Sequence, residues 1–369
     1  MEPDEITREW RKRLKGQDHV IDSIVPYIIK FLVNLNRPGQ PVGNFLLLGP
    51  TGTGKTRAVE ALAEVLHGSA DHVLKIDCGE FQMEHEVAKL IGAPPGYLGH
   101  RETHPLLSQQ KINSVASDQC ALSIVLLDEI EKAASSMWRL LLGVMDKASL
   151  RLGDNSNVKF DQTAIFMTSN IGAQELQNLI NPNWGMGRST VNAAEKFADG
   201  KSLGQLQKVG AGALNKKFPP EFPNRVDVVV TFRPLGHDTL LDITRSELDI
   251  ILTHINERLG SGGFHIDAGH EVIEFLVAKG TSVKWGAREI KRTIDRELYN
   301  PIAYDFARKR IQNDDILHVK VDDNKLVWDV EHKSKPVSVA AALEHITKTG
   351  VVVEPTETLT VSCDSMINE

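Results

Sequence analysis

Short apolar runs, separated by longer segments with helical periodicity, dominate the first two thirds of the chain. The runs suit strands that are buried on both faces; they cover residues 45–48, 73–76, 123–127, 164–168 and 228–232. Between the first two runs, in residues 57–67, apolar side chains recur every three to four positions, which predicts a helix. Alternating strands and helices predict an α/β domain built on a largely parallel, five-stranded sheet with helices on both faces.

The segments around this alternating region have other patterns. Residues 5–36 have helical periodicity, and the prolines and glycine of residues 36–41 indicate a linker before the first strand. Residues 181–203 contain Asn, Gly, Ser and Pro with little periodicity, so we expect an irregular insertion there.

The pattern changes again near Pro234, Leu235 and Gly236. Beyond this point we expect helices and then two strands; the helices cover 239–259, 271–279 and 287–309, and the strands cover 316–321 and 326–330. We therefore predict a large domain over residues 1–235, a smaller and mostly helical α+β domain over 236–330, and a loosely ordered tail over 331–369.

Composition and charge narrow the class of protein. Of the 369 residues, 41% are hydrophobic and 25% are charged, as is typical of a globular chain with a substantial core. The net charge of -7 and the pI near 6.0 weigh against a nucleic-acid partner. A protein that grips duplex nucleic acid usually has a basic surface.

The cysteines and the N-terminus indicate the compartment. Cys78, Cys120 and Cys363 are far apart and form no C-x-x-C pair, which predicts a reducing compartment with neither a disulfide framework nor a zinc site. The acidic N-terminus lacks the features of a signal or transit peptide, and no run approaches the roughly 18 apolar residues of a membrane span. We therefore expect a cytoplasmic protein without a membrane partner.

The strongest chemical signal is a phosphate-binding loop after the first predicted strand. Its residues fit the pattern G-x-x-x-x-G-K-[ST] and are Gly49, Pro50, Thr51, Gly52, Thr53, Gly54, Lys55 and Thr56. The glycines let backbone N–H groups cradle phosphate oxygens, and the following helix directs its positive N-terminus at the same charge. We expect Lys55 to neutralise the β- and γ-phosphates and Thr56 to bind Mg2+. The alternative is a glycine-rich turn without function.

Two acids at the end of the third predicted strand complete this pattern. Asp128 and Glu129 follow the apolar run from Ser123 to Leu127, and carboxylates there are costly to bury unless they are paired or bind a metal. Phosphoryl transfer needs a metal-binding acid and a residue that orients the nucleophile. We expect Asp128 to hold Mg2+ together with Thr56, and Glu129 to polarise the attacking water. The alternative is a pair of ordinary acids at the end of a strand.

Five motifs, which follow one another as they do in a known family, make the chain similar to that family, the AAA+ ATPases of the Clp type. The resemblance is to the second ATPase module of ClpB- and ClpA-type protein unfoldases and covers about residues 14–330; its motifs are Gly92 to Tyr97, Asp128 to Ala133, Met167 to Gly172, Pro220 to Arg225, and Gly286 to Arg288 with its continuation to Pro301. It implies a parallel AAA+ sheet flanked by helices and a smaller lid domain. The family sequence Val-Ile-Gly-Gln, near the adenine, reads Leu14-Lys15-Gly16-Gln17 here.

The resemblance also implies roles for four residues. Asn170 matches sensor 1, which positions the attacking water, and Arg288 matches sensor 2, which couples the lid to the nucleotide. Arg225 matches the arginine finger, which reaches the γ-phosphate of a neighbouring subunit. Tyr97 matches the pore loop that grips a translocating polypeptide. The alternatives are a polar strand cap for Asn170, a surface pair with Asp227 for Arg225, a solvated helix face for Arg288, and packing within the domain for Tyr97.

Taken as a whole, the resemblance implies an enzyme that hydrolyses ATP to ADP and phosphate, with ATP and Mg2+ as cofactors. It implies a homo-oligomeric ring, a hexamer, that remodels proteins by threading polypeptides. The sequence has no Ile-Gly-Phe or Ile-Gly-Leu loop, which disfavours a peptidase partner. Two other classes remain open: a nucleic-acid motor or loader, and an ATP-dependent scaffold without threading activity.

Overall fold

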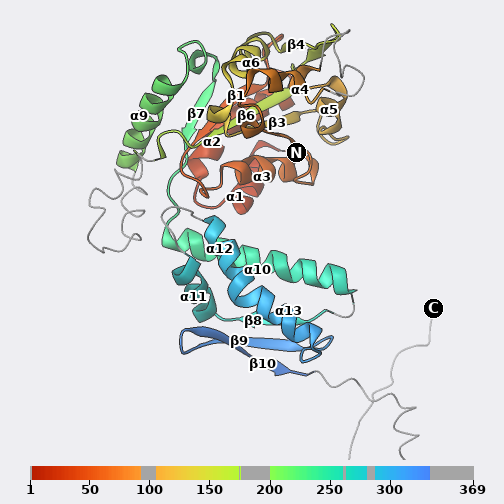
Figure 1. Cartoon of the computed structure of the whole chain (residues 1–369), viewed down its shortest axis with the longest axis vertical. Coiled ribbons are helices and arrows are strands. Elements are labelled where there is room, and N and C mark those ends of the chain that lie inside the picture. The colour runs from red at the N-terminus through yellow and green to blue at the C-terminus, as the bar shows by residue number, and fades with distance from the viewer. Residues whose placement is uncertain are drawn as a thin grey trace, which may run out of the picture.

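The fold is described from a computed structural model that covers residues 2–92, 105–173, 175, 200–260, 263–280 and 287–332. Tyr97, most of the predicted insertion at 181–203 and the predicted tail from residue 333 lie outside the described residues. Figure 1 shows an α/β body stacked on a smaller body, with α1 and α3 on the side that faces α10 and α12.

The larger body is built on the predicted five-stranded parallel sheet, which is confirmed. The strands lie in the order β2-β3-β6-β1-β7 and all neighbours are parallel. They are β1 (Gly43–Leu48), β2 (Leu74–Asp77), β3 (Ser123–Asp128), β6 (Thr163–Ser169) and β7 (Val228–Thr231). Every residue of β1 and β6 is buried, because these strands lie inside the sheet and both of its faces are covered.

Two hydrophobic clusters cover the two faces of this sheet. Alternate residues of β1 divide between them, with Phe45 and Leu47 in one cluster and Leu46 and Leu48 in the other. The first cluster is completed by α1 (Pro3–Arg13), α2 (Asp18–Leu32) and α3 (Lys55–His67). The elements that follow in the larger body are η1 (Cys78–Glu80), η2 (Glu84–Val87), α4 (Ala88–Ile91), α5 (Gln109–Ser114), η3 (Ile130–Lys132), α6 (Ser135–Lys147), α9 (Gly200–Lys217) and η4 (Pro223–Arg225). Most of these supply the second cluster.

The N-terminal segment differs from the single helical stretch predicted for residues 5–36. It forms two helices, because Gly16 turns the chain with a φ of 71°, a backbone angle that favours glycine. An antiparallel hairpin of β4 (Ser149–Arg151) and β5 (Asn157–Lys159) was also not predicted. Its strands are too short for an alternating pattern to be recognised.

The smaller body has its own hydrophobic cluster, which lies between its helices and a three-stranded sheet. Its helices are α10 (His237–Leu259), α11 (His270–Gly280), α12 (Ala287–Ile294) and α13 (Asn300–Ala307), and a π-helical turn, Asp295–Tyr299, joins the last two. The predicted strands appear as β9 (Ile316–Asp322) and β10 (Lys325–Glu331), which pair antiparallel. A third strand, β8 (His265–Ala268), was missed; it pairs parallel with β9.

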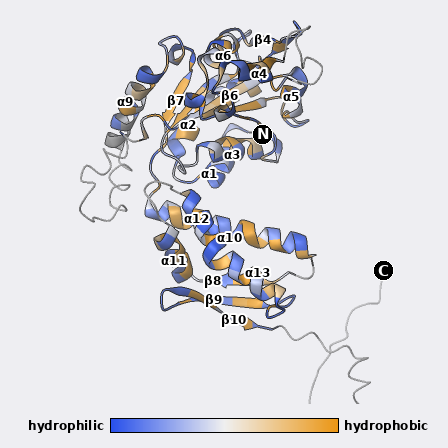
Figure 2. Ribbon diagram, viewed as in Figure 1, coloured by the Kyte–Doolittle hydropathy of each residue, from blue (hydrophilic) through white to orange (hydrophobic). Residues whose placement is uncertain are grey.

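The distribution of hydropathy follows these layers. In Figure 2 the long helix α10 carries alternating hydrophilic and hydrophobic bands, as expected for a helix with one face on a core. Within the described residues, no helix is long and apolar enough to span a membrane.

Candidate active site

The phosphate-binding loop lies between the end of β1 and the start of α3. Gly49, Gly52 and Gly54 have φ angles of 144°, 78° and 99°, which side-chain-bearing residues rarely adopt. At Gly49 a Cβ atom would also lie 3.0 Å from Cβ of Phe232, in the segment after β7. The loop therefore requires its glycines, and α3 begins at Lys55 with its N-terminus open toward the loop.

Lys55 lies in the centre of this loop with all three of its protons engaged. Its Nζ atom donates to the carbonyl oxygens of Gly49 at 2.7 Å and Pro50 at 2.9 Å, and to Oδ1 of Asn170 at 2.9 Å. Burial lowers the pKa of Lys55 to about 8, although the nearby carboxylates, led by Asp128, act in the opposite direction. The oxygens of a phosphate group would accept one or more of these hydrogen bonds from Lys55. The phosphate would also supply negative charge next to the buried ammonium.

The two acids lie at the carboxyl end of β3, beside the end of β6. Asp128 Oδ1 accepts a hydrogen bond from the hydroxyl of Thr168, and the backbone N–H of Glu129 donates to the same hydroxyl oxygen at 3.0 Å. Glu129 adopts a left-handed backbone conformation with φ 56° and ψ 48°, and it starts the turn η3. Such strain in a residue other than glycine is a feature of functional sites.

Asn170 connects the acids to the phosphate-binding loop. Its Nδ2 atom donates to Oε1 of Glu129 at 3.2 Å, while its Oδ1 accepts from Lys55 and, at 3.4 Å, from the hydroxyl of Thr51. The predicted site residues Lys55, Glu129 and Asn170 thus form one hydrogen-bonded chain where three adjacent parallel strands end. Ligands of parallel sheets bind at this edge.

A cavity of about 590 Å³ opens over these three hydrogen-bonded side chains, between the two bodies. The loop residues Thr51 to Thr56 line one side with Asp128, Glu129 and Asn170, and the other side includes Arg288 and Lys291 of α12. The backbone N–H of Ala287, at the start of α12, donates to the carbonyl of Gly52 at 3.1 Å. The predicted sensor residue Arg288 is therefore held at the rim of the loop.

The residues present suit a nucleotide with Mg2+. The hydroxyl of Thr56 and the carboxylate of Asp128 are hard oxygen donors of the kind Mg2+ prefers, and the described residues contain no group of three or more metal-ligating side chains. A metal here would complete its shell with phosphate and water oxygens. Apolar side chains in the same lining offer a surface for a base; they are Leu14, Leu235, Ile243 and Ile250.

Arg225 lies outside the cavity lining, on the surface turn η4. Its guanidinium forms an exposed ion pair with Asp146 at 3.4 Å, and its side chain is 47% exposed. The partner considered from the sequence, Asp227, instead accepts the backbone N–H of Asn44 at 2.8 Å. Tyr97 lies outside the described residues.

Three further residues support the site, although sequence reasoning assigned them no role. Gln17 is fully buried and donates to the carbonyls of Arg233 at 2.9 Å and Thr53 at 3.3 Å, which ties the loop to the connection between the two bodies. Lys132 forms an ion pair with Glu129. Glu131 accepts the backbone N–H of Asn170 at 3.0 Å. All three lie in the stretches Leu14 to Gln17 and Asp128 to Ala133, which resemble the family, but only the fold shows where their side chains lie.

Comparisons with known proteins agree with this geometry. The profile of the family described as AAA domain (Cdc48 subfamily) matches residues 40–229, and that of the C-terminal, D2-small domain of ClpB protein matches residues 235–319. The chaperone protein ClpB of Bdellovibrio bacteriovorus is 35% identical over 318 residues, which cover 86% of this chain and 34% of that protein. ClpB of Aquifex aeolicus is 34% identical over 338 residues, or 91% of this chain and 31% of that protein.

A solved structure shows the same similarity in three dimensions. The closed-state cryo-EM reconstruction of Hsp104 with ATPγS and FITC-casein matches with a TM-score of 0.71 and 26% identity, over 89% of this chain and 51% of that chain. The chain spans about a third of the length of the curated relatives it matches. The matched domain profiles, together with the site geometry, show that the chain belongs to the AAA ATPase family, as a Clp-type member that resembles the second ATPase module of ClpB.

Proposed function

We propose that the chain binds ATP with Mg2+ in the cavity between its two bodies and hydrolyses it to ADP and phosphate. The observation that carries this proposal is the hydrogen-bonded chain from Lys55 through Asn170 to Glu129, at the mouth of a glycine loop and beneath Arg288. These groups supply the positive charge, the metal-binding oxygens and the water-polarising carboxylate that phosphoryl transfer requires.

Each residue has a distinct task in this proposal. Lys55 and the N-terminus of α3 neutralise the phosphates, and Thr56 and Asp128 hold Mg2+, which shields the charge that develops on them. Glu129 accepts a hydrogen bond from an attacking water and directs it at the γ-phosphate, while Asn170 fixes the orientation of that carboxylate. Arg288 and Lys291 bring positive charge from the lid to the same anion.

The position of Arg225 on the surface is an argument for an oligomeric assembly. Its exposed side chain lies outside the cavity of its own subunit and forms an ion pair with the surface acid Asp146. A surface arginine of this kind is suited to complete the site of a neighbouring copy, and closed rings repeat one such contact around the whole assembly. We therefore propose a ring, a hexamer, in which each active site is shared by two subunits.

The proposed work of this ring is protein remodelling in the cytoplasm. Support comes from the relatives, which are named chaperones, and from the solved structure of Hsp104 with ATPγS and FITC-casein. Tyr97 is the proposed grip on the polypeptide. The absence of an Ile-Gly-Phe or Ile-Gly-Leu loop from the sequence disfavours a peptidase partner. The net charge of -7 disfavours a nucleic-acid partner.

Turnover of ATP with and without unfolded casein tests the activity. We expect casein to stimulate hydrolysis, Glu129→Gln to reduce turnover at least about a hundredfold while nucleotide still binds, and Tyr97→Ala to remove only the response to casein. Turnover that ignores casein but rises with single-stranded DNA would replace the unfoldase with a nucleic-acid motor. Turnover that neither polymer affects would favour the scaffold.

A mixing experiment tests the shared site. Arg225→Ala alone and Glu129→Gln alone are both expected to be inactive, because one lacks the arginine and the other the carboxylate. In mixed rings, Glu129→Gln subunits still offer Arg225 to the intact sites of their Arg225→Ala neighbours. We expect turnover to reappear on mixing. A mixture as inactive as its components would rule out action of Arg225 across the subunit interface.

A further inference from the structure

The turn η3, directly after the two acids, is held rigidly against the core. Ile130 is fully buried, and its carbonyl accepts the indole N–H of Trp138 at 3.0 Å. The left-handed backbone of Glu129 starts the turn, and the N–H of Lys132 closes it on the carbonyl of Glu129 at 2.9 Å. The side chains of this turn therefore project from a fixed frame.

From this frame, Glu131 reaches across to the end of the neighbouring strand β6. Its Oε1 atom accepts the backbone N–H of Asn170 at 3.0 Å. Asn170 is the first residue past the paired part of β6, whose last partner pair is Leu48 with Ser169. Because no strand partner is left for this N–H, the carboxylate of Glu131 takes the place of the sheet in fixing it.

The second oxygen of Glu131 makes the arrangement unusual. Oε2 is buried, and no group within the described part of the chain donates a hydrogen bond to it. A buried carboxylate oxygen without a donor is unfavourable, so a residue that keeps one needs a compensating reason. The bond to the Asn170 N–H is the one hydrogen bond recorded for this side chain among the described residues.

We propose that Glu131 is a positioning residue for the hydrolytic reaction: it fixes the backbone of Asn170 so that the Asn170 side chain can hold Lys55 and Glu129 together. The inference rests on the proposed ATPase activity. The side chain of Asn170 contacts Lys55 on one side and Glu129 on the other, at 2.9 and 3.2 Å. A displacement of its backbone would disturb both contacts at once, and small misplacements of catalytic groups have large effects on rate.

The proposed role of residue 131 requires a hydrogen-bond acceptor for the Asn170 N–H. Glu131→Gln retains a carbonyl oxygen that can accept the Asn170 N–H, whereas Glu131→Ala removes the acceptor altogether. The two variants therefore separate the hydrogen bond from the mere presence of a side chain. Glu297→Ala serves as a matched control, because Glu297 is also a partly buried carboxylate, but it lies in the lid and pairs with Lys279 and Arg296.

Steady-state turnover gives the first readout. We expect Glu131→Ala to lower kcat at least about tenfold, with the Kd for a fluorescent ATP analogue within about threefold of wild type, since Lys55 and the glycine loop are intact. Glu131→Gln should retain most of the activity, and Glu297→Ala should match wild type. The double variant Glu131→Ala/Asn170→Ala should be no slower than Asn170→Ala, because both changes act through one side chain.

Hydrogen–deuterium exchange gives a second readout that does not depend on turnover. The peptide over residues 163–173 should exchange faster in Glu131→Ala than in wild type or Glu131→Gln, since its Asn170 amide loses its acceptor. Unchanged exchange there, or a kcat within twofold of wild type, would overturn the proposal. Additive losses in the double variant would do the same. If wild type hydrolyses no ATP, the proposed function fails, and the exchange experiment alone decides whether Glu131 holds Asn170.

Discussion

At the scale of single residues, buried and half-buried polar groups differ in whether they face the cavity. Lys55 and Asn170 do, and a phosphate can complete their hydrogen bonds. His67, at the C-terminal end of α3, does not: it is 7% exposed, its Nδ1 lies 2.9 Å from the hydroxyl of Ser117, and its Nε2 is buried with no hydrogen-bond partner in the part of the chain that the structure describes. It also stacks on His72, with ring centroids 5.1 Å apart.

This environment predicts acid sensitivity of the larger body. Burial, and to a lesser extent the charge of His72, lowers the pKa of His67 to about 4, while an unfolded histidine titrates near 6.5. Above about pH 6.5 both states are neutral at this side chain. Between that pH and about 4 the unfolded state takes up the proton first, so the free energy of unfolding falls by up to about 1.4 kcal/mol per pH unit from this residue.

Urea unfolding at a series of pH values measures the effect. We expect His67→Leu to flatten the decline between about pH 6.5 and 4, because the variant cannot take up the proton. His254→Gln, which changes an exposed histidine of α10, should retain the slope of wild type. Equal slopes in all three proteins would show that His67 does not contribute to the pH dependence.

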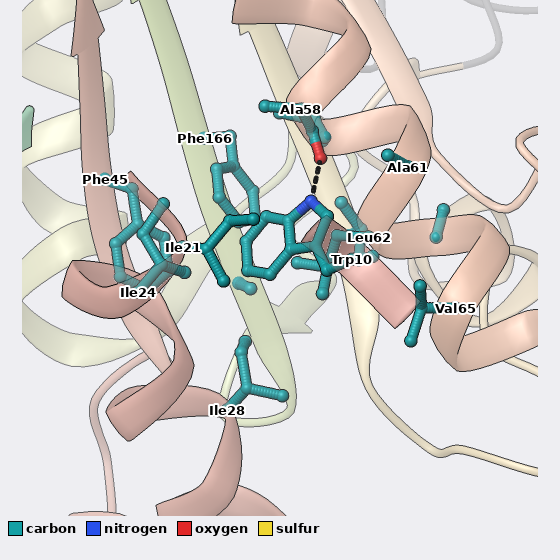
Figure 3. Packing of buried hydrophobic residues seen from close by; sticks show 14 of the residues in the cluster. Trp10, Ile21, Ile24, Ile28, Phe45, Ala58, Ala61, Leu62, Val65 and Phe166 are labelled. Atoms are coloured by element: carbon teal, nitrogen blue, oxygen red, sulfur yellow. Dashed lines mark hydrogen bonds between the residues drawn. The ribbon is translucent and has the colours of Figure 1, made fainter. Parts of the chain in front are cut away.

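At the scale of elements, α1 is anchored in the larger body by the fully buried side chains of Ile6 and Trp10. Trp10 is fully buried among Ile21, Phe45, Leu62 and Phe166, and its indole N–H donates to the carbonyl of Ala58 in α3 at 3.0 Å (Figure 3). Residues from α2, β1, α3 and β6 thus meet around a helix whose opposite face is charged. This helix ends at Arg13, beside the cavity.

Truncation of the Trp10 side chain should weaken the packing of α1 against the larger body. We expect Trp10→Ala to lower the free energy of unfolding by about 3–5 kcal/mol, through lost burial and the cavity left behind. Trp10→Phe keeps most of the volume but loses the indole hydrogen bond, so its effect should be smaller. Denaturant unfolding gives both values. A loss of less than about 1 kcal/mol for Trp10→Ala would mean that α1 is not part of the cooperative core.

At the scale of the whole molecule, the turn between α1 and α2 contacts the lid. Gly16 has a φ of 71°, and a Cβ atom there would lie 2.8 Å from Cγ2 of Thr239, in the first turn of α10. The next residue, Gln17, bonds both the phosphate-binding loop and Arg233. The N-terminal turn, the glycine loop and the lid therefore form one connected unit around the cavity.

Gly16→Ala should strain this unit in two separable ways. The left-handed backbone alone costs about 1–2 kcal/mol with a side chain, and the clash with Thr239 adds to it. Gly68→Ala is the matched control, because Gly68 has a φ of 83° but nothing within 4 Å of the added atom. We expect Gly16→Ala to lower the unfolding midpoint more than Gly68→Ala, and the added change Thr239→Ala to recover the difference. Equal midpoints for the two alanine variants would show that the turn does not press on the lid.

The sequence patterns predicted the parallel sheet and the phosphate-binding loop, but they did not predict several short elements. β8 and the β4–β5 hairpin have only three or four residues per strand, so their patterns do not differ from those of loops. The break in the predicted helix at 5–36 lies at Gly16, which has a φ of 71° and leaves no room for a Cβ atom beside Thr239 of the lid. The helical periodicity on either side of this residue does not reveal that contact. The ion pair of Arg225 with Asp146 joins positions far apart in the chain, and no local pattern could have indicated it.

The sequence by itself determined a largely parallel sheet, the succession of strands and helices along the chain, and the loop that turns a strand end into an anion site. These features depend on local periodicity and on glycines at fixed spacing, which act over a few residues. Only the tertiary structure decided that Asn170 joins Lys55 to Glu129, that Glu131 holds Asn170, and that α12 closes on Gly52. These contacts join strand ends and helices distant in the chain, and the packing of the two bodies brings them together.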